Sequence, residues 1–161
     1  MAALAGILAV VVAAVVDDRP RTLSRPIPAP AAGPALPPSE LAGRWSGTGS
    51  LTDCAGFDDC PRTPSLTLAI SCPGESCTVT AVGRGAGSPP LRFEAGRYRA
   101  AGPVRAEVAP ACVGAPSTSA MWRLDLVVSG GRLVGSYEQS TGQSLNCGAT
   151  SVEWSVTLAR T

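Results

Sequence analysis

Apolar and polar side chains alternate along most of the chain beyond residue 41, with the two-residue period of a β-strand. Trp122, Leu124 and Leu126 fall on one face of such a run, while Arg123 and Asp125 fall on the other. No stretch of similar length shows the period of a helix. The pattern predicts eight strands, at about 42–51, 65–71, 77–83, 90–95, 97–103, 120–129, 132–140 and 151–160.

Short turn sequences separate several of these strands. Pro-Gly-Glu-Ser at 73–76, Ala-Gly at 95–96 and Gly-Gly at 130–131 are typical of tight hairpins. Each strand is polar on one side, as in an antiparallel sheet with one wet face. The fold class expected is therefore all-β: an eight-stranded antiparallel up-and-down barrel, which leaves no sheet edge exposed. A two-sheet β-sandwich is the alternative. Phe93 and Tyr98 are expected on the apolar faces of the fourth and fifth strands.

Two N-terminal segments precede this β domain, which is expected over 41–161. Residues 1–16 are small and apolar throughout, shorter than the about 20 residues of a membrane span. They suit the core of a signal peptide, although no arginine precedes them. A late start inside a longer gene would instead make them the end of a membrane anchor, and a buried cytosolic helix is a third interpretation. Residues 17–40 contain seven prolines and predict an extended linker. Either export interpretation places the β domain outside the cytoplasm, secreted or anchored.

The composition removes most catalytic chemistry. The chain has no histidine, and its 13 basic residues are all arginine. Without histidine or lysine there is no Ser-His-Asp triad, imidazole metal ligand, Schiff base or P-loop lysine. A net charge of +1 does not suggest nucleic-acid binding. We therefore expect no enzyme, catalytic residue, metal or cofactor. The abundance of Arg, Ala, Gly and Pro is typical of a GC-rich bacterial genome.

The even number of cysteines predicts disulfides in an extracytoplasmic protein, because the C-x5-C and C-x4-C spacings do not match zinc sites. Connections in an up-and-down barrel alternate between its ends. Cys72 and Cys77 flank the second connection and can only pair with each other, whereas the other four cysteines gather at the opposite end. The simplest pairing is local for the first two of these four and between loops for the last two. The topology thus predicts Cys72–Cys77. Cys54–Cys60 and Cys112–Cys147 are the simplest pairing of the other four cysteines, whose partners the sequence leaves open.

The first and last strands carry a family resemblance. The opening strand reads LAGRWSG, with a Gly43-x-Trp45 motif, and the chain ends with Arg160 in VTLART. Together with RLVGSYEQ at 132–139, these residues resemble the calycin superfamily of lipocalins and avidins. The resemblance implies that Trp45 and Arg160 are structural and close the barrel floor. The ligand residues of avidins do not map onto this chain, so biotin binding is not implied.

The order of segments carries a second resemblance. An apolar anchor, a Pro-rich stalk and a disulfide-stapled β domain resemble the extracytoplasmic sensor halves of actinobacterial serine/threonine kinases. They resemble secreted or anchored proteins of the same bacteria equally well. No kinase residues are present in the chain.

Three polar features of the sequence have both a functional and a structural interpretation. Asp53, Asp58 and Asp59 could bind Ca²⁺, but their spacing matches no calcium loop, and a solvated acidic loop is expected. The Gly-rich stretch 83–90 ends in prolines that lead into a strand, so it lacks the helix of a phosphate-binding loop. The third feature is a group of charged residues on the outer face of the fourth and fifth strands: Arg92, Arg97 and Arg99, with Glu94 among them. This group could bind an anionic cell-wall polymer or lipid head group, or it could be an ordinary charged exterior.

The barrel interior is the remaining candidate site. Tyr98, Trp122, Tyr137 and Trp154 are amphipathic aromatics that suit a pocket for a small apolar or envelope-derived ligand. Alternatively they fill the core. The sequence therefore favours an extracytoplasmic ligand-binding or sensor domain, with a protein- or envelope-interaction module built on a solid barrel as the alternative.

Overall fold

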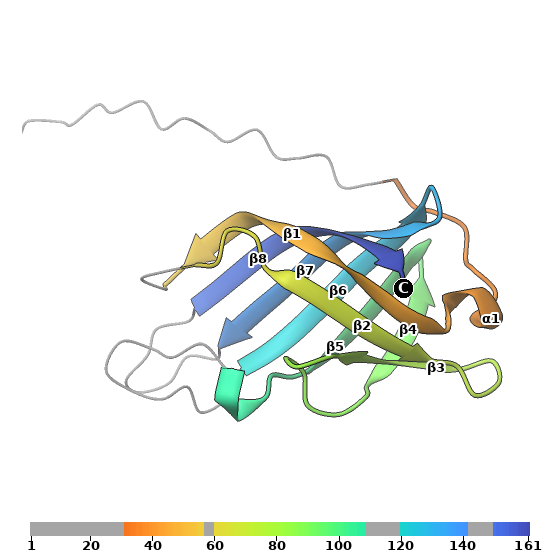
Figure 1. Cartoon of the computed structure of the whole chain (residues 1–161), viewed down its shortest axis with the longest axis horizontal. Coiled ribbons are helices and arrows are strands. Elements are labelled where there is room, and N and C mark those ends of the chain that lie inside the picture. The colour runs from red at the N-terminus through yellow and green to blue at the C-terminus, as the bar shows by residue number, and fades with distance from the viewer. Residues whose placement is uncertain (1–30, 57–59, 109–119, 142–149) are drawn as a thin grey trace, which may run out of the picture.

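The chain forms a closed antiparallel β-barrel of eight strands, in which every strand pairs with its sequence neighbours and β8 returns to β1 (Figure 1). The computed structural model describes residues 31–56, 60–108, 120–141 and 150–161. A single closed sheet confirms the up-and-down barrel and not the sandwich. The elements are α1 (Pro38–Leu41), β1 (Gly43–Ala55), β2 (Ser65–Ser71), β3 (Cys77–Ala81), β4 (Pro90–Glu94), β5 (Arg97–Pro103), the 3-10 turn η1 (Ala106–Val108), β6 (Ala120–Ser129), β7 (Arg132–Thr141) and β8 (Thr150–Arg160).

The two ends of the barrel differ in their connections. One end, on the right in Figure 1, carries α1 and the connections 72–76, 95–96 and 130–131; it is termed the capped end. The opposite, or loop, end carries the longer connections. The hairpin at the capped end of β6 and β7 turns at Gly130 and Gly131, whose φ values of 56° and 73° suit the turn that matches strand twist.

Alternating side chains fill the interior. The burial of β8 follows its sequence, with Val152, Trp154, Val156 and Leu158 all at most 3% exposed. Burying a Val or Leu side chain contributes about 1.5–3 kcal/mol, so this row is a principal source of stability. The largest fully buried side chains are Trp122, Trp154 and Tyr137. The core is therefore built from the strand faces that the alternation predicts.

The ladder is weakest between β3 and β4. These strands pair only through Cys77–Leu91 and Thr78–Pro90, whereas β6 and β7 pair along their whole length. Pro90 has no N–H to donate, and proline limits a strand's ladder. The short junction is termed the β3–β4 seam. It leaves the far half of β4 without a strand on that side.

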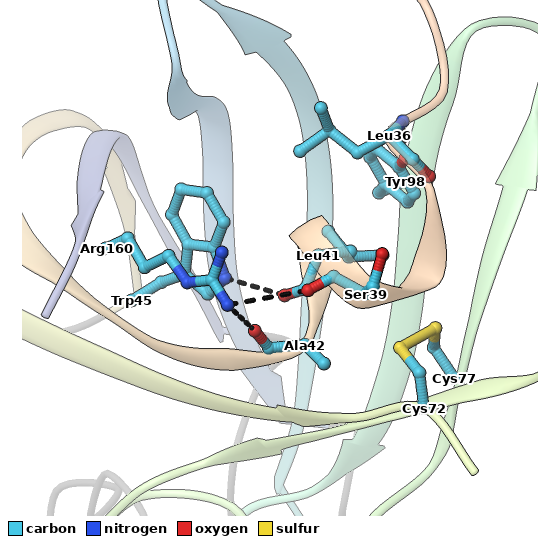
Figure 2. The surroundings of a disulfide bond; sticks show 9 residues. All are labelled: Leu36, Ser39, Leu41, Ala42, Trp45, Cys72, Cys77, Tyr98 and Arg160. Atoms are coloured by element: carbon cyan, nitrogen blue, oxygen red, sulfur yellow. Dashed lines mark hydrogen bonds between the residues drawn. A yellow bond between two sulfur atoms is a disulfide. The ribbon is translucent and has the colours of Figure 1, made fainter. Parts of the chain in front are cut away.

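Residues 33–42 form a strap that covers the capped end (Figure 2). The backbone N–H of Gly33 donates to the carbonyl of Gly96 at 3.1 Å, and the N–H of Leu36 donates to the Tyr98 hydroxyl at 2.7 Å. In α1 the side chain of Leu41 is only 2% exposed. Part of the segment expected as a linker therefore packs against the barrel.

Trp45 and Arg160 are ladder partners at this end. The Trp45 indole N–H donates to the Leu41 carbonyl at 2.8 Å, and the Arg160 guanidinium donates to the Ala42 carbonyl at 2.7 Å. Figure 2 shows both side chains directed at the end of the strap. Trp45 and Arg160, two of the residues that carry the calycin resemblance, thus hold the strap in place.

Two of the expected disulfides are confirmed. Cys54–Cys60 and Cys72–Cys77 are bonded, with Cα–Cα distances of 6.3 and 4.1 Å. The expected Cys112–Cys147 bridge lies outside the described residues, as do the apolar segment 1–16 and most of the linker. Within the ranges that the structure covers, no helix has the length and apolarity to cross a membrane.

Candidate functional site

The four aromatic candidates are all buried but do not meet in one place. Tyr98 lies at the capped end, with its hydroxyl bonded to the strap. Trp122, Tyr137 and Trp154 lie in the half of the barrel nearer the loop end. Tyr98 therefore cannot share an interior pocket mouth with the other three.

Tyr137 and Trp154 satisfy their polar atoms inside the protein. Their rings stack with centroids 5.8 Å apart. The Gln139 amide donates to the Tyr137 hydroxyl at 2.7 Å, and the Trp154 indole N–H donates to the Pro61 carbonyl at 2.6 Å. Burial raises the pKa of Tyr137, and the hydrogen bond from Gln139 and the charge of Arg84 oppose that rise. These two side chains behave as satisfied core aromatics.

Trp122 is different. It is fully buried, and its Nε1–H has no hydrogen-bond partner among the described residues. Its ring lies between Gly85 and Gly102, and a Cβ built on Gly85 would be 2.5 Å from Nε1. A buried donor without a partner costs about 1–3 kcal/mol, so this atom is the one conspicuous polar defect of the described core.

The Gly-rich stretch 83–90 supplies the cover for Trp122. Gly85 forms an isolated bridge with Val104, and its N–H donates to the Ala81 carbonyl at 2.7 Å. The stretch leads into β4, as its prolines predict, with no helix behind it to hold a phosphate. Its glycine at 85 serves the close approach to the indole ring.

The acidic candidates do not form a metal site in the described part of the chain. Asp53 lies within β1, which continues to Ala55 beyond its expected end at 51, and so it is not a loop residue. Asp58 and Asp59 lie outside the described residues. In the described ranges no group of three or more His, Cys, Asp or Glu side chains could hold a metal.

The three candidate arginines lie on the outside of β4 and β5. Arg92 and Arg99 are direct ladder partners, so two guanidinium groups project from neighbouring positions of one face. Arg97 and Arg99 both pair with Asp125, the latter at 3.1 Å. Arg92 has no ion pair among the described residues. Directly opposed like charges destabilise a sheet, which marks this position as unusual.

A shallow hollow of about 590 Å³, termed the arginine groove, lies over these strands. The small side chains of Ala101 and Ser136 leave room between the longer ones. Arg123, which lies across from Glu138 at 3.9 Å, extends the charged lining onto β6. The groove is lined by Pro90, Arg92, Glu94, Arg99, Ala100, Ala101, Arg123, Leu124, Asp125, Ser136 and Glu138.

A second hollow of about 360 Å³, termed the apolar pocket, lies between the strap, the 72–76 connection and β4. Leu36, Leu91, Phe93 and Tyr98 supply the apolar part of its lining, and Glu75, Ser76 and Arg92 supply a polar part of comparable extent. The Phe93 and Tyr98 rings lie 4.8 Å apart, tilted by 51°. Burial raises the pKa of Tyr98, opposed by the hydrogen bond with Leu36.

Phe93 departs from the expectation that it lies on a buried face. It is 41% exposed, while its ladder partner Tyr98 is 3% exposed. The reason is the β3–β4 seam: Cys77, the first residue of β3, pairs with Leu91, so Phe93 lies past the end of its neighbour. The alternation alone could not reveal this, because it carries no information on where the adjacent strand begins.

The chain matches no protein-family model, and neither the curated proteins nor the solved structures include a significant match. The closed eight-stranded barrel is consistent with a calycin-like fold. Membership of the calycin superfamily stays a prediction.

Proposed function

We propose that this chain is an extracytoplasmic binding domain that recognises an anionic ligand on the outside of a solid, calycin-like barrel. The arginine groove is the recognition surface. In this proposal residues 1–16 export or anchor the chain, and the domain acts as a secreted or tethered sensor of actinobacterial type without catalytic activity. Two disulfides support the compartment, since such bridges persist in oxidising environments.

The opposition of Arg92 and Arg99 carries the proposal. Two arginines in direct register repel each other, and only Arg99 has a carboxylate partner in the described chain. Each guanidinium can bind a carboxylate or phosphate group with two parallel hydrogen bonds. An anion held between them would remove the repulsion, so the arrangement favours the bound state over the empty one.

The packing of the interior supports the same choice. The polar atoms of Tyr98, Tyr137 and Trp154 bind to groups of the protein itself. A ligand at those positions would have to displace existing hydrogen bonds. In the outer groove Arg99 already pairs with Asp125, whereas Arg92 has no ion pair among the described residues.

The test is a titration of the exported chain with inorganic phosphate, followed by amide and arginine side-chain NMR. We expect shifts confined to β4, β5 and β6 that Arg92→Gln abolishes. Arg44→Gln, an exposed arginine on β1, is the matched control and should leave the shifts unchanged. Shifts elsewhere, or shifts equally sensitive to both variants, would refute the groove as the site.

One observation favours a second candidate, a small-molecule site in the loop half of the barrel. The Trp122 indole N–H is buried without a partner in the described residues, and a ligand carbonyl could accept its hydrogen bond only by displacing Gly85, whose backbone lies against Nε1. Native mass spectrometry of the exported chain separates the two candidates. A mass that leaves on denaturation, persists in Arg92→Gln and is absent from Trp122→Phe would favour the interior site.

A further inference from the structure

We infer that the arginine groove and the apolar pocket are two halves of one site, which takes an amphiphile with an anionic head and an apolar tail. The head lies against Arg92 and Arg99, and the tail lies beside Phe93. The inference rests on the proposed function and narrows it to a class of ligand.

The two hollows meet on β4. Pro90 and Arg92 line both of them. Arg92 projects from the outer face of β4 and Phe93 from the inner face, so a ligand would pass from one hollow to the other around the edge of β4 beyond Leu91, where the pairing with β3 has ended. Arg92 is the common residue that bears charge. A ligand that reaches its guanidinium from the pocket therefore reaches Arg99 as well, because the two arginines are ladder partners.

The apolar half offers surface that the fold leaves uncovered. Phe93 is 41% exposed and packs its ring against Tyr98 at a centroid distance of 4.8 Å. Leu36 of the strap and Leu91 of β4 add aliphatic atoms to this surface, and Glu75 and Ser76 of the 72–76 connection add polar atoms to the same lining. Removing apolar surface from water stabilises a complex, so an alkyl chain here gains affinity that a polar ligand does not.

The backbone explains why the pocket stays open. β3 begins at Cys77, which is bonded to Cys72, and the connection between them lies at the pocket's border. The strap is fixed on the other side by the bond between Leu36 and the Tyr98 hydroxyl. Figure 2 shows Tyr98, the strap and the Cys72–Cys77 bridge around the same end of the barrel. Both borders are fastened, so the hollow does not close by collapse of either one.

The charges select the ligand's polar end. Arg92 and Arg99 face a groove that also contains Glu94, Asp125 and Glu138. Asp125 is occupied by Arg97 and Arg99, and Glu138 lies near Arg123. Among the described groove residues, Arg92 and Glu94 are the two charges without an ion pair, and Arg92 is the one that favours a compact anionic head such as a phosphate or carboxylate.

The experiment compares three probes on the exported chain by calorimetry and NMR: dodecyl phosphate below its micelle-forming concentration, inorganic phosphate, and dodecyl maltoside. We expect dodecyl phosphate to bind at least about tenfold more tightly than phosphate, a difference of about 1.4 kcal/mol. Its shifts should centre on Arg92, Phe93 and Tyr98. Dodecyl maltoside should bind more weakly, since it lacks the anionic head.

Two variants assign the halves of the site. Phe93→Ala should weaken dodecyl phosphate binding and leave phosphate binding unchanged, whereas Arg92→Gln should weaken both. Val108→Ala, which removes an exposed apolar side chain far from the pocket, is the control for Phe93→Ala. Arg44→Gln is the control for Arg92→Gln. Retained far-ultraviolet circular dichroism excludes misfolding as the cause.

The possible failures are distinct. Equal affinity for the two phosphates, with no effect of Phe93→Ala, would overturn the amphiphile site and leave the anion groove standing. Tight dodecyl maltoside binding insensitive to Arg92→Gln would overturn the role of the anionic head. Shifts that begin only when micelles form would identify a lipid surface and overturn the single-molecule site. Absence of binding by either phosphate would refute the proposed function as well.

Discussion

Replacement of Gly85 by alanine tests whether the Gly-rich stretch 83–90 exists to cover Trp122. The new Cβ would lie 2.5 Å from the indole Nε1 and 3.3 Å from the Ala81 Cβ. The ring cannot retreat easily, because Gly102 approaches its other atoms closely: a Cβ there would lie 3.0 Å from Cζ2. Overpacking of this kind costs about 1–3 kcal/mol.

The backbone at Gly85 does not add to this cost. Its φ lies outside the left-handed region, so alanine meets no conformational strain there. Alanine also restricts the unfolded chain, which stabilises the fold by about 0.4–1 kcal/mol and offsets part of the clash. The expected net loss in the free energy of unfolding therefore lies between about 0 and 2.6 kcal/mol.

Urea unfolding of a double-mutant cycle with Trp122→Phe isolates the contact. Phenylalanine lacks Nε1, so Gly85→Ala should cost little in the Trp122→Phe background, and the two changes should couple by more than about 0.5 kcal/mol. Additive effects would show that the clash is not with the indole. A neutral Gly85→Ala in the unchanged chain, together with no coupling to Trp122→Phe, would show that the close approach does not constrain the stretch.

Three further predictions concern the capped end, the bridges and the buried tyrosines. Tyr98→Phe removes the partner of the Leu36 N–H and should lower stability by about 0.5–1.5 kcal/mol, with faster hydrogen exchange at Leu36 as the local signature; unchanged exchange there would contradict the strap. Cys72→Ser with Cys77→Ser should cost roughly 2 kcal/mol in urea unfolding under oxidising conditions, because so short a loop restricts the unfolded chain only modestly; a loss of the fold would show that the bridge does more than hold a hairpin. Burial raises the pKa of Tyr137 above its usual 10.0, so the unfolded chain releases this proton first as pH rises. The contribution of Tyr137 to the free energy of unfolding should be constant below pH 10 and decrease above it. Urea unfolding across alkaline pH should therefore show a smaller decrease in stability for Tyr137→Phe than for the unchanged chain.

Strand positions and the barrel followed from the sequence because alternation and turn chemistry are local properties. The Gly130-Gly131 pair predicts a hairpin whatever the rest of the fold is. The alternation of apolar and polar residues along β8 determines which of its side chains are buried. The Cys72–Cys77 bridge followed as well, since the topology left each cysteine a single neighbour.

The site was harder to predict because it depends on relations between strands. The exposure of Phe93 arises from where β3 begins, and the opposition of Arg92 and Arg99 arises from the register of β4 against β5. The strap reads as a proline-rich linker, yet Leu36 and Leu41 pack on the barrel. In each case a contact distant in sequence decides the structure.

The placement of the strap gives the domain a mechanical weak point. Force applied through the chain before Ala31 would act first on the Gly33–Gly96 hydrogen bond and then on the Leu36–Tyr98 hydrogen bond, so the two would break in sequence. The strand ladder would be loaded only after Leu41 leaves the capped end. Because Leu36 also forms a wall of the apolar pocket, tension on the N-terminal segment would dismantle that pocket while the barrel itself stayed intact.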